Sequence, residues 1–233
     1  MISAINDEIA SDIDILIRIL KKTKIKYIEL RKIDDKYLFL IENKKLKKYS
    51  EKLKLNKIKV SLIDSPIGKN KYSIDVENKI IHDYIKICKI FNCKYLRIFS
   101  DTNLKEYNEL AKKNKITILL ENEKNTRFED YKEIINEIKN YSNIKILYDA
   151  ENYYSCNIDY LKAMEELEDY IKYVHIRDIK DGKYVYLYDG EIDIKKIKEK
   201  FKKKFISLET HLPMVSTLPK EELFKESLRR IYE

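Results

Sequence analysis

The sequence predicts an α/β fold, a (β/α)8 TIM barrel, and two features of the chain indicate it. Short apolar runs rich in β-branched residues alternate with charged segments that have helical spacing. The runs are apolar at consecutive positions, which is typical of parallel strands buried on both faces of a sheet. Eight such strand-and-helix units are the number that closes this barrel.

Eight runs are predicted as the strands, and a helical stretch follows each of them. The strands cover residues 2–5, 26–30, 58–63, 95–99, 116–120, 144–148, 170–176 and 205–208. The clearest helical stretches cover residues 9–22, 76–91, 128–141, 159–171, 194–204 and 219–233. An open doubly wound sheet is the competing fold, but the first strand leads into AINDEIASD instead of a glycine-rich phosphate-binding turn.

The whole chain, residues 1–233, is predicted to form one domain. Its length suffices for one large core, and no Pro/Gly-rich linker or charge block divides it. No apolar run approaches the roughly 20 residues of a membrane span, and the N-terminal MISAINDEIASD lacks the basic-then-apolar order of a signal peptide. We therefore expect a cytoplasmic protein without a membrane partner.

The net charge of +8 and the pI near 9.0 raise the question of nucleic-acid binding. The 48 basic residues are interspersed with 40 acidic ones along the whole chain. This distribution is typical of a solvated, charged surface, so no nucleic-acid partner is expected.

Polar side chains at the ends of four consecutive predicted strands form the candidate site. Glu121 ends ITILLE, Asp149 ends IKILYD, His175 lies in IKYVHIRD and Glu209 ends FISLE. Because active sites of such barrels form at the C-terminal ends of the strands, we expect these four side chains to converge on one rim.

The chemistry of these four residues indicates a metal site. Carboxylates with one imidazole suit a single divalent ion: Mn²⁺, Mg²⁺, Co²⁺ or Zn²⁺. Without a cation, three clustered carboxylates would raise one another's pKa values, so a bound metal is the simplest explanation of the cluster. The alternative is that each is an isolated polar residue at a loop edge.

The strand-end segments resemble those of the xylose isomerase-like TIM barrels, a family of sugar phosphate isomerases/epimerases. The matching segments are DEIASDIDILIRILKKTKIKYIELR, VSLIDSPIGK, CKYLRIF, ILLENE, ILYDAENYY, YVHIRDIKDGKYVYLYDGEID and SLETHL. The resemblance extends from about residue 7 to residue 212, and SPIGK, ENE, HIRD and ETHL are specific only in combination.

The resemblance implies that Glu121, Asp149, His175 and Glu209 hold one divalent metal, and that Glu121 and Glu209 also take and return a substrate proton. A metal that chelates the carbonyl and adjacent hydroxyl of a ketose stabilises the enediolate that forms when a carboxylate removes the α-proton. Return of the proton to another face or carbon gives epimerisation or isomerisation. The expected partner is a small sugar or sugar phosphate, and a homo-oligomer is possible because family members commonly associate.

Five basic residues around the rim are candidates for substrate binding, with an ion pair as the alternative for each. They are Lys69, Arg97, Arg177, His211 and Arg31. Asn152 and Asp178 are expected to lie behind the metal ligands and fix them, and Glu29 is a candidate partner of Arg31.

Three loops depart from the family pattern. The chain has DAEN, YDGE and ETHL where family members often have DPAN, GxG and EPHL. None of these changes removes a metal ligand, but they reshape loops beside the site, so the sequence does not identify the sugar.

Two further classes of function stay open beside the isomerase/epimerase. One is a polyol or keto-sugar dehydratase, or a barrel that binds a polyol without catalysis, because the same ligands serve these roles. The other is an apurinic-site endonuclease, which shares the barrel and the four-residue core. That enzyme needs several further histidines for three zinc ions, whereas this chain has three histidines in all.

Overall fold

The computed structural model describes residues 1–69, 73–99 and 103–233, and its main sheet has eight parallel strands. In sheet order they are β1 (Ile2–Ala4), β12 (Phe205–Leu208), β9 (Ile171–Ile176), β8 (Ile144–Asp149), β7 (Thr117–Glu121), β6 (Tyr95–Ile98), β5 (Lys59–Asp64) and β2 (Tyr27–Leu30). A parallel bridge between Ile5 and Glu29 closes the sheet into a ring. The predicted TIM barrel is confirmed, and every predicted strand is present.

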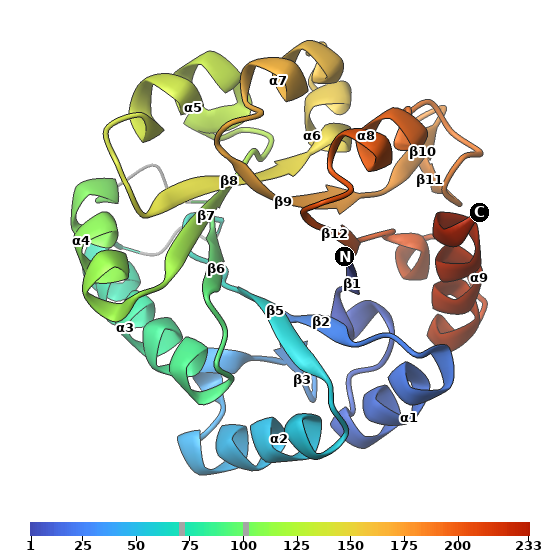
Figure 1. The fold of residues 1–233 in the computed structure, drawn as a ribbon, viewed down its shortest axis with the longest axis horizontal. Helices are drawn as coiled ribbons and strands as arrows, with labels where there is room; N and C mark the ends of the chain where they lie inside the picture. Colours follow the sequence, from blue (N-terminus) through green and yellow to red (C-terminus); the bar gives the residue numbers. More distant parts are fainter. Residues whose placement is uncertain (70–72, 100–102) are drawn as a thin grey trace.

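Helices surround this ring on its outer side (Figure 1). They are α1 (Ile13–Thr23), α2 (Asn43–Leu55), α3 (Ile74–Ile90), α4 (Leu104–Asn114), α5 (Tyr131–Ile138), α6 (Ala150–Ser155), α7 (Tyr160–Glu166), α8 (Ile194–Lys200) and α9 (Lys220–Tyr232). Apolar side chains of helices and strands form one large core between the two layers, which explains why the strand segments are apolar at consecutive positions.

Acidic side chains set the starts of several helices. Asp12, Asp130 and Asp159 accept hydrogen bonds from backbone N–H groups in the first turns of α1, α5 and α7. The helix predicted over 159–171 ends at Glu166, because the chain then turns into β9.

Short elements follow the strands at the mouth of the barrel and were not predicted. They are the hairpins β3 (Lys32–Ile33) with β4 (Lys36–Tyr37) and β10 (Asp178–Lys180) with β11 (Lys183–Val185), and the 3-10 turns η1 (Asn6–Glu8), η2 (Leu38–Leu40), η3 (Arg127–Glu129) and η4 (Leu212–Met214).

The strand register sets the candidate residues at one level. Asp149 of β8 pairs with His175 of β9, and His175 pairs in turn with Ser207 of β12. Glu209 is the second residue after Ser207, and Glu121 is the last residue of β7. The four side chains therefore leave the sheet at neighbouring positions of its C-terminal edge.

A small apolar cluster fills the inside of the barrel below that level. It consists of Leu62, Leu119, Leu147 and Tyr173, all fully buried. The barrel therefore has a packed floor, in which the buried Ser61 hydroxyl bonds to the hydroxyl of Tyr173, and the charged candidate residues lie above it.

Across 1–69, 73–99 and 103–233, no helix has both the length and the apolarity that crossing a membrane requires.

Candidate metal centre

The four side chains predicted to converge lie together at the mouth of the barrel. One oxygen or nitrogen atom from each of Glu121, Asp149, His175 and Glu209 lies within 4.8 Å of the corresponding atoms of the other three. All four residues are buried, and even Glu209 is only 3% exposed. Three carboxylates and one imidazole at this spacing can share a single cation.

His175 is held so that one ring nitrogen faces this cluster. Its Nε2 lies 2.9 Å from Oε1 of Glu29, which sits behind the cluster. Its Nδ1 lies 2.7 Å from Oε2 of Glu209 and 3.3 Å from Oε1 of Glu121. A carboxylate that accepts the outer N–H of a histidine fixes the tautomer and orientation of the ring. Glu29 therefore orients His175 and not its expected partner Arg31, which lies past the end of β2.

A buried chain of charged groups leads from His175 back to Glu121. The carboxyl groups of Glu29 and Asp64 are neighbours in this buried region and act on each other's pKa. Burial raises the pKa of Asp64 well above its ordinary value in spite of the nearby Arg97 charge, and the neighbouring Glu29 carboxylate raises it further. Arg97 lies 3.2 Å from Oδ1 of Asp64 and 2.7 Å from Oε2 of Glu121. Arg97 thus holds Glu121 in place, as Glu29 holds His175.

Glu121 and Glu209 are both ionised at neutral pH. Burial acts to raise the pKa of Glu121, but the charges of Arg97 and His175 outweigh it and lower this pKa to about 2. Burial opposes ionisation of Glu209 too, and the charges led by His175 hold its pKa well below the ordinary value.

The same carboxylates act on the imidazole. Burial alone would lower the pKa of His175, but the charges of Glu29, Glu209 and Glu121 raise it well above the ordinary value. A metal ion that binds Nδ1 of His175 therefore has to displace a proton.

Asp149 divides its two oxygens between the fold and the cluster. Oδ1 accepts hydrogen bonds from the backbone N–H groups of Glu151 and Asn152 and so caps α6. Burial raises the pKa of Asp149 to about 7, although the adjacent Arg177 opposes this shift. Because α6 begins directly at the strand end, the cap itself fixes the direction of the Asp149 side chain.

Arg177 borders the cluster on the Asp149 side. Its Nη2 lies 2.9 Å from Oδ2 of Asp149 and donates to Oδ1 of Asn152 at 2.8 Å. Its Nε lies 2.8 Å from Oε2 of Glu151. Asn152 also donates to the backbone carbonyl of Asn122 at 2.7 Å, so it steadies the arginine that contacts Asp149.

Two buried atoms of the cluster support its fit to a metal ion. Oδ2 of Asp149 and Nδ1 of His175 make no hydrogen bond in the part of the chain that the structure describes, although each lies near an opposite charge. Buried polar atoms are normally paired, so orphaned ones call for a further ligand. An oxygen and an imidazole nitrogen aimed into a carboxylate cluster are the donors that a divalent cation needs.

A cavity of about 310 Å³ opens above the cluster. All five basic residues predicted to contact substrate line it: Arg31, Lys69, Arg97, Arg177 and His211. Each of them also contacts an acidic side chain, and His211 contacts Arg177 as well. Ion pairing and access to the cavity therefore occur together.

Arg31 and Lys69 each form ion pairs at this cavity. Nη1 of Arg31 lies 2.9 Å from Oε1 of Glu209, and its Nε lies 3.0 Å from Oδ1 of Asp7. Nζ of Lys69 lies 2.9 Å from Oε2 of Glu123.

His211 lies between Glu8 and Arg177. Its Nδ1 is 2.8 Å from Oε1 of Glu8, and its Nε2 is 2.7 Å from Nη1 of Arg177. Glu8, Glu209 and His211 form a second group with metal-like spacing. Guanidinium groups of Arg31 and Arg177 already contact these side chains, so positive charge is supplied there by the protein itself.

Asp178 was expected to lie behind the metal ligands and fix them, but its carboxylate binds backbone groups of the loop that follows β9. Its carboxylate accepts backbone N–H groups of Ile179, Tyr188, Gly190 and Ile192 at 2.9–3.0 Å. Asp178 thus ties the loop after β9 together, because the chain folds back over its carboxylate.

Several residues of the site were not predicted. They are Asp7, Glu8, Asp64, Asn122 and Glu151. Asp64 ends VSLID just as Glu121 ends ITILLE, so the strand-end position was a usable signal. Glu151 and Asn122 carry no such signal, because their contacts depend on how the loops fold over the mouth.

Comparison with known sequences identifies one family. Residues 17–233 match the sequence profile described as xylose isomerase-like TIM barrel. No curated protein sequence matches the chain.

Solved structures of similar proteins cover nearly the whole chain. The IOLI protein with a binding zinc atom has 16% identity and a TM-score of 0.80, over 99% of this chain and 96% of that one. The probable 3-DHS dehydratase AsbF from Bacillus anthracis has 15% identity and a TM-score of 0.78, over 99% and 98%. The 3-keto-D-glucoside 4-epimerase YcjR from E. coli has 13% identity and a TM-score of 0.75, over 99% and 98%. At these identities the likeness is one of fold.

Proposed function

Because the chain belongs to the xylose isomerase-like TIM barrel family, we propose that it is a divalent-metal-dependent sugar or sugar-phosphate isomerase/epimerase. The convergence of Glu121, Asp149, His175 and Glu209 within 4.8 Å of one another carries this proposal. Structures similar in fold include both an epimerase and a probable dehydratase, and one that holds a zinc atom.

Glu121 and Glu209 are proposed as the residues that move the proton. Glu121 ends β7 and Glu209 follows β12, with β8 and β9 between these strands, and one oxygen of each carboxylate lies near Nδ1 of His175. Both are ionised, as a residue that accepts a proton must be. A substrate carbon in the cavity between them would meet one carboxylate on each face, which is the arrangement that epimerisation needs.

The remaining residues have separate proposed roles. A divalent ion held by the four residues would polarise the substrate carbonyl and make its α-proton more acidic. Arg31, Lys69, Arg97, Arg177 and His211 line the cavity and would orient hydroxyl or phosphate groups of the sugar. Glu29 and Asn152 would keep His175 and Arg177 in position.

Proton exchange with solvent tests this proposal directly. Mn²⁺-loaded protein is incubated with a panel of ketoses and ketose phosphates in deuterated water, and deuterium at the α-carbon is followed by NMR. We expect exchange with at least one substrate, and loss of it in Glu121→Gln and Glu209→Gln. Glu133→Gln, the same change on the exposed face of α5, should exchange like the wild type.

The products separate the remaining alternatives. A new epimer or aldose supports the proposed reaction, whereas loss of water from the exchanged substrate would make the protein a dehydratase. Absence of exchange with every sugar, in protein that holds its metal, would contradict the proposal. Incision of abasic duplex DNA in the presence of Zn²⁺ would move the function to the endonucleases.

A further inference from the structure

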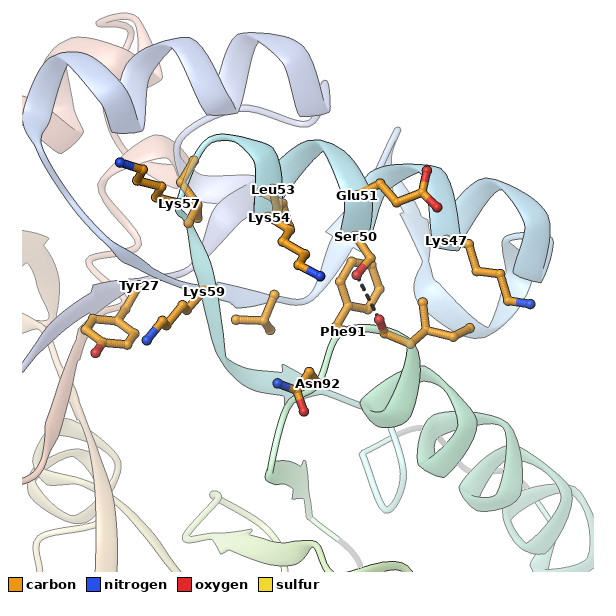
Figure 2. Close-up of a pocket in the computed structure, with 13 residues that line it drawn as sticks. Tyr27, Lys47, Ser50, Glu51, Leu53, Lys54, Lys57, Lys59, Phe91 and Asn92 are labelled. Carbon is orange, nitrogen blue, oxygen red and sulfur yellow. Dashed lines mark hydrogen bonds between the residues drawn. The ribbon is translucent and has the colours of Figure 1, made fainter.

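A second cavity lies at the opposite end of the barrel from the candidate metal centre. It has a volume of about 780 Å³ and is bounded by the C-terminal half of α2, the start of β5 and the turn after α3. Figure 2 shows this groove, in which Ser50 of α2 donates a hydrogen bond to the carbonyl of Ile90. The volume is in the range of small-molecule binding sites.

The floor of the groove is apolar. Leu53, Ile58 and Phe91 are nearly buried and lie beneath it, and Val60 and Ile90 are partly exposed beside them. A bound molecule would therefore gain contact with apolar surface that is now partly open to water.

The rim of the groove carries uncompensated positive charge. Lys47, Lys54, Lys57 and Lys59 line it, and no acidic side chain of the described residues pairs with any of them. In Figure 2 Lys54 extends from α2 over the groove and Lys59 lies beside Tyr27, whereas the carboxylate of Glu51 points away from both.

Other lysines on α2, in contrast, are paired with acidic side chains. Lys45 lies 2.7 Å from Oδ2 of Asp34, and Lys52 lies 2.7 Å from Oδ2 of Asp14. Acidic side chains of α1 and of the β3–β4 turn thus compensate these two lysines, whereas the lysines at the groove remain available to another anion.

We propose that this groove binds a small amphipathic anion, with an apolar or aromatic body on the floor and a phosphate or similar group between Lys54 and Lys59. A nucleic acid fits less well, because a polyanion needs an extended track of free cations. Here the free lysines border a single groove, and Glu51 and the paired lysines interrupt the surface beside it.

Binding of 1-naphthyl phosphate tests the proposal. The titration is followed by the fluorescence of the naphthyl group at low salt and in the presence of a chelator, so that a metal at the barrel mouth plays no part. We expect saturable binding that is at least about tenfold weaker in the Lys54→Gln/Lys59→Gln double variant, because two charge-assisted contacts to the phosphate are lost. The matched control Lys44→Gln/Lys48→Gln removes the same amount of charge from α2 outside the groove and should bind within about twofold of the wild type.

Further probes decide what the groove recognises. Inorganic phosphate and 1-naphthalenemethanol should each bind far more weakly than 1-naphthyl phosphate, since each lacks one half of the proposed ligand. Glu121→Gln should leave binding unchanged, so failure of the proposed enzymatic function would not affect this result. Equal weakening in the two lysine pairs, absence of saturable binding, or preferential binding of a 20-base-pair duplex would overturn the proposal.

Discussion

Glu29 is not one of the proposed metal ligands, yet its contact with Nε2 of His175 leaves Nδ1 of that ring facing the carboxylate cluster. Both residues are fully buried, and the 2.9 Å contact joins positions 146 residues apart. No sequence pattern predicts a contact between two residues so far apart in the chain. What the sequence does reveal is that Glu29 stands near a strand end, and the same signal identified the four cluster residues.

Replacement of Glu29 should weaken metal binding without removing any proposed ligand. We expect Glu29→Ala to lower the affinity for Mn²⁺ about 10- to 100-fold, because the outer N–H of His175 loses its acceptor. Glu29→Gln keeps an acceptor oxygen and should lose less. Isothermal titration calorimetry measures both, and wild-type affinity in Glu29→Ala would show that Glu29 does not position His175.

Asp149 should make the stability of the metal-free protein depend on pH. Its folded pKa of about 7 lies above the ordinary 3.8, so the folded state binds more protons and stability is lost as pH rises between these values. Relative to Asp149→Asn, the wild type should lose about 2–3 kcal/mol of unfolding free energy between pH 5 and pH 8. Urea unfolding of both proteins across this range provides the test. Parallel stability curves would mean that Asp149 is not the group that titrates.

At the residue scale, the sequence does not predict which charged side chains pair with each other. Lys69, Arg97 and Arg177 were left between substrate contact and ion pair, and each lies in an ion pair at the cavity. A formal charge is visible in the sequence, but its partner depends on which loops meet above the sheet.

At the scale of elements, the apolar pattern of the sequence predicted the long helices and the barrel strands, but not the short elements at the mouth. The eight strands and the helices at 13–23, 74–90 and 220–232 agree with the predicted segments within a few residues. The hairpins β3–β4 and β10–β11 and the one-turn helices were missed, since two or three residues hold no readable period. Their shape depends on side-chain contacts with backbone groups distant in sequence.

The loop over residues 178–192 is the clearest example of such dependence. Asp178 binds four of its backbone N–H groups, and a Cβ atom at Gly190 would lie 2.2 Å from the Asp178 carboxylate. Asp178→Ala should therefore lower the unfolding free energy by roughly 3 kcal/mol, because these donors lose a charged acceptor.

The matched change Asp178→Asn retains one oxygen acceptor and should cost about half as much. Chemical denaturation measures the two variants side by side. If Asp178→Ala unfolds at the wild-type denaturant midpoint, the loop is held by other contacts.

At the scale of the whole molecule, the barrel separates stability from chemistry. Apolar side chains fill its inside and the layer beneath the helices, while buried charges collect at the C-terminal mouth. The mouth combines ionised carboxylates with three arginines, so it is neutralised in part by the protein itself. A divalent ion would compete with those arginines and with the proton on His175.

If the four residues form one site, metal binding should still stabilise the folded protein in spite of this competition. At a Mn²⁺ concentration about 100 times Kd, binding to the folded state alone adds about 2.7 kcal/mol. For a chain of this size the melting temperature should rise by roughly 5–10 °C. Differential scanning calorimetry of wild type and Glu209→Gln checks this, and an equal rise in both would place the ion elsewhere.

The most direct test of the shared cation is anomalous scattering from crystals grown with Mn²⁺. We predict one strong peak at about 2.0–2.4 Å from carboxylate oxygens of Glu121, Asp149 and Glu209 and from Nδ1 of His175. A map with no peak among these four residues, and with guanidinium groups still against their carboxylates, would contradict the account.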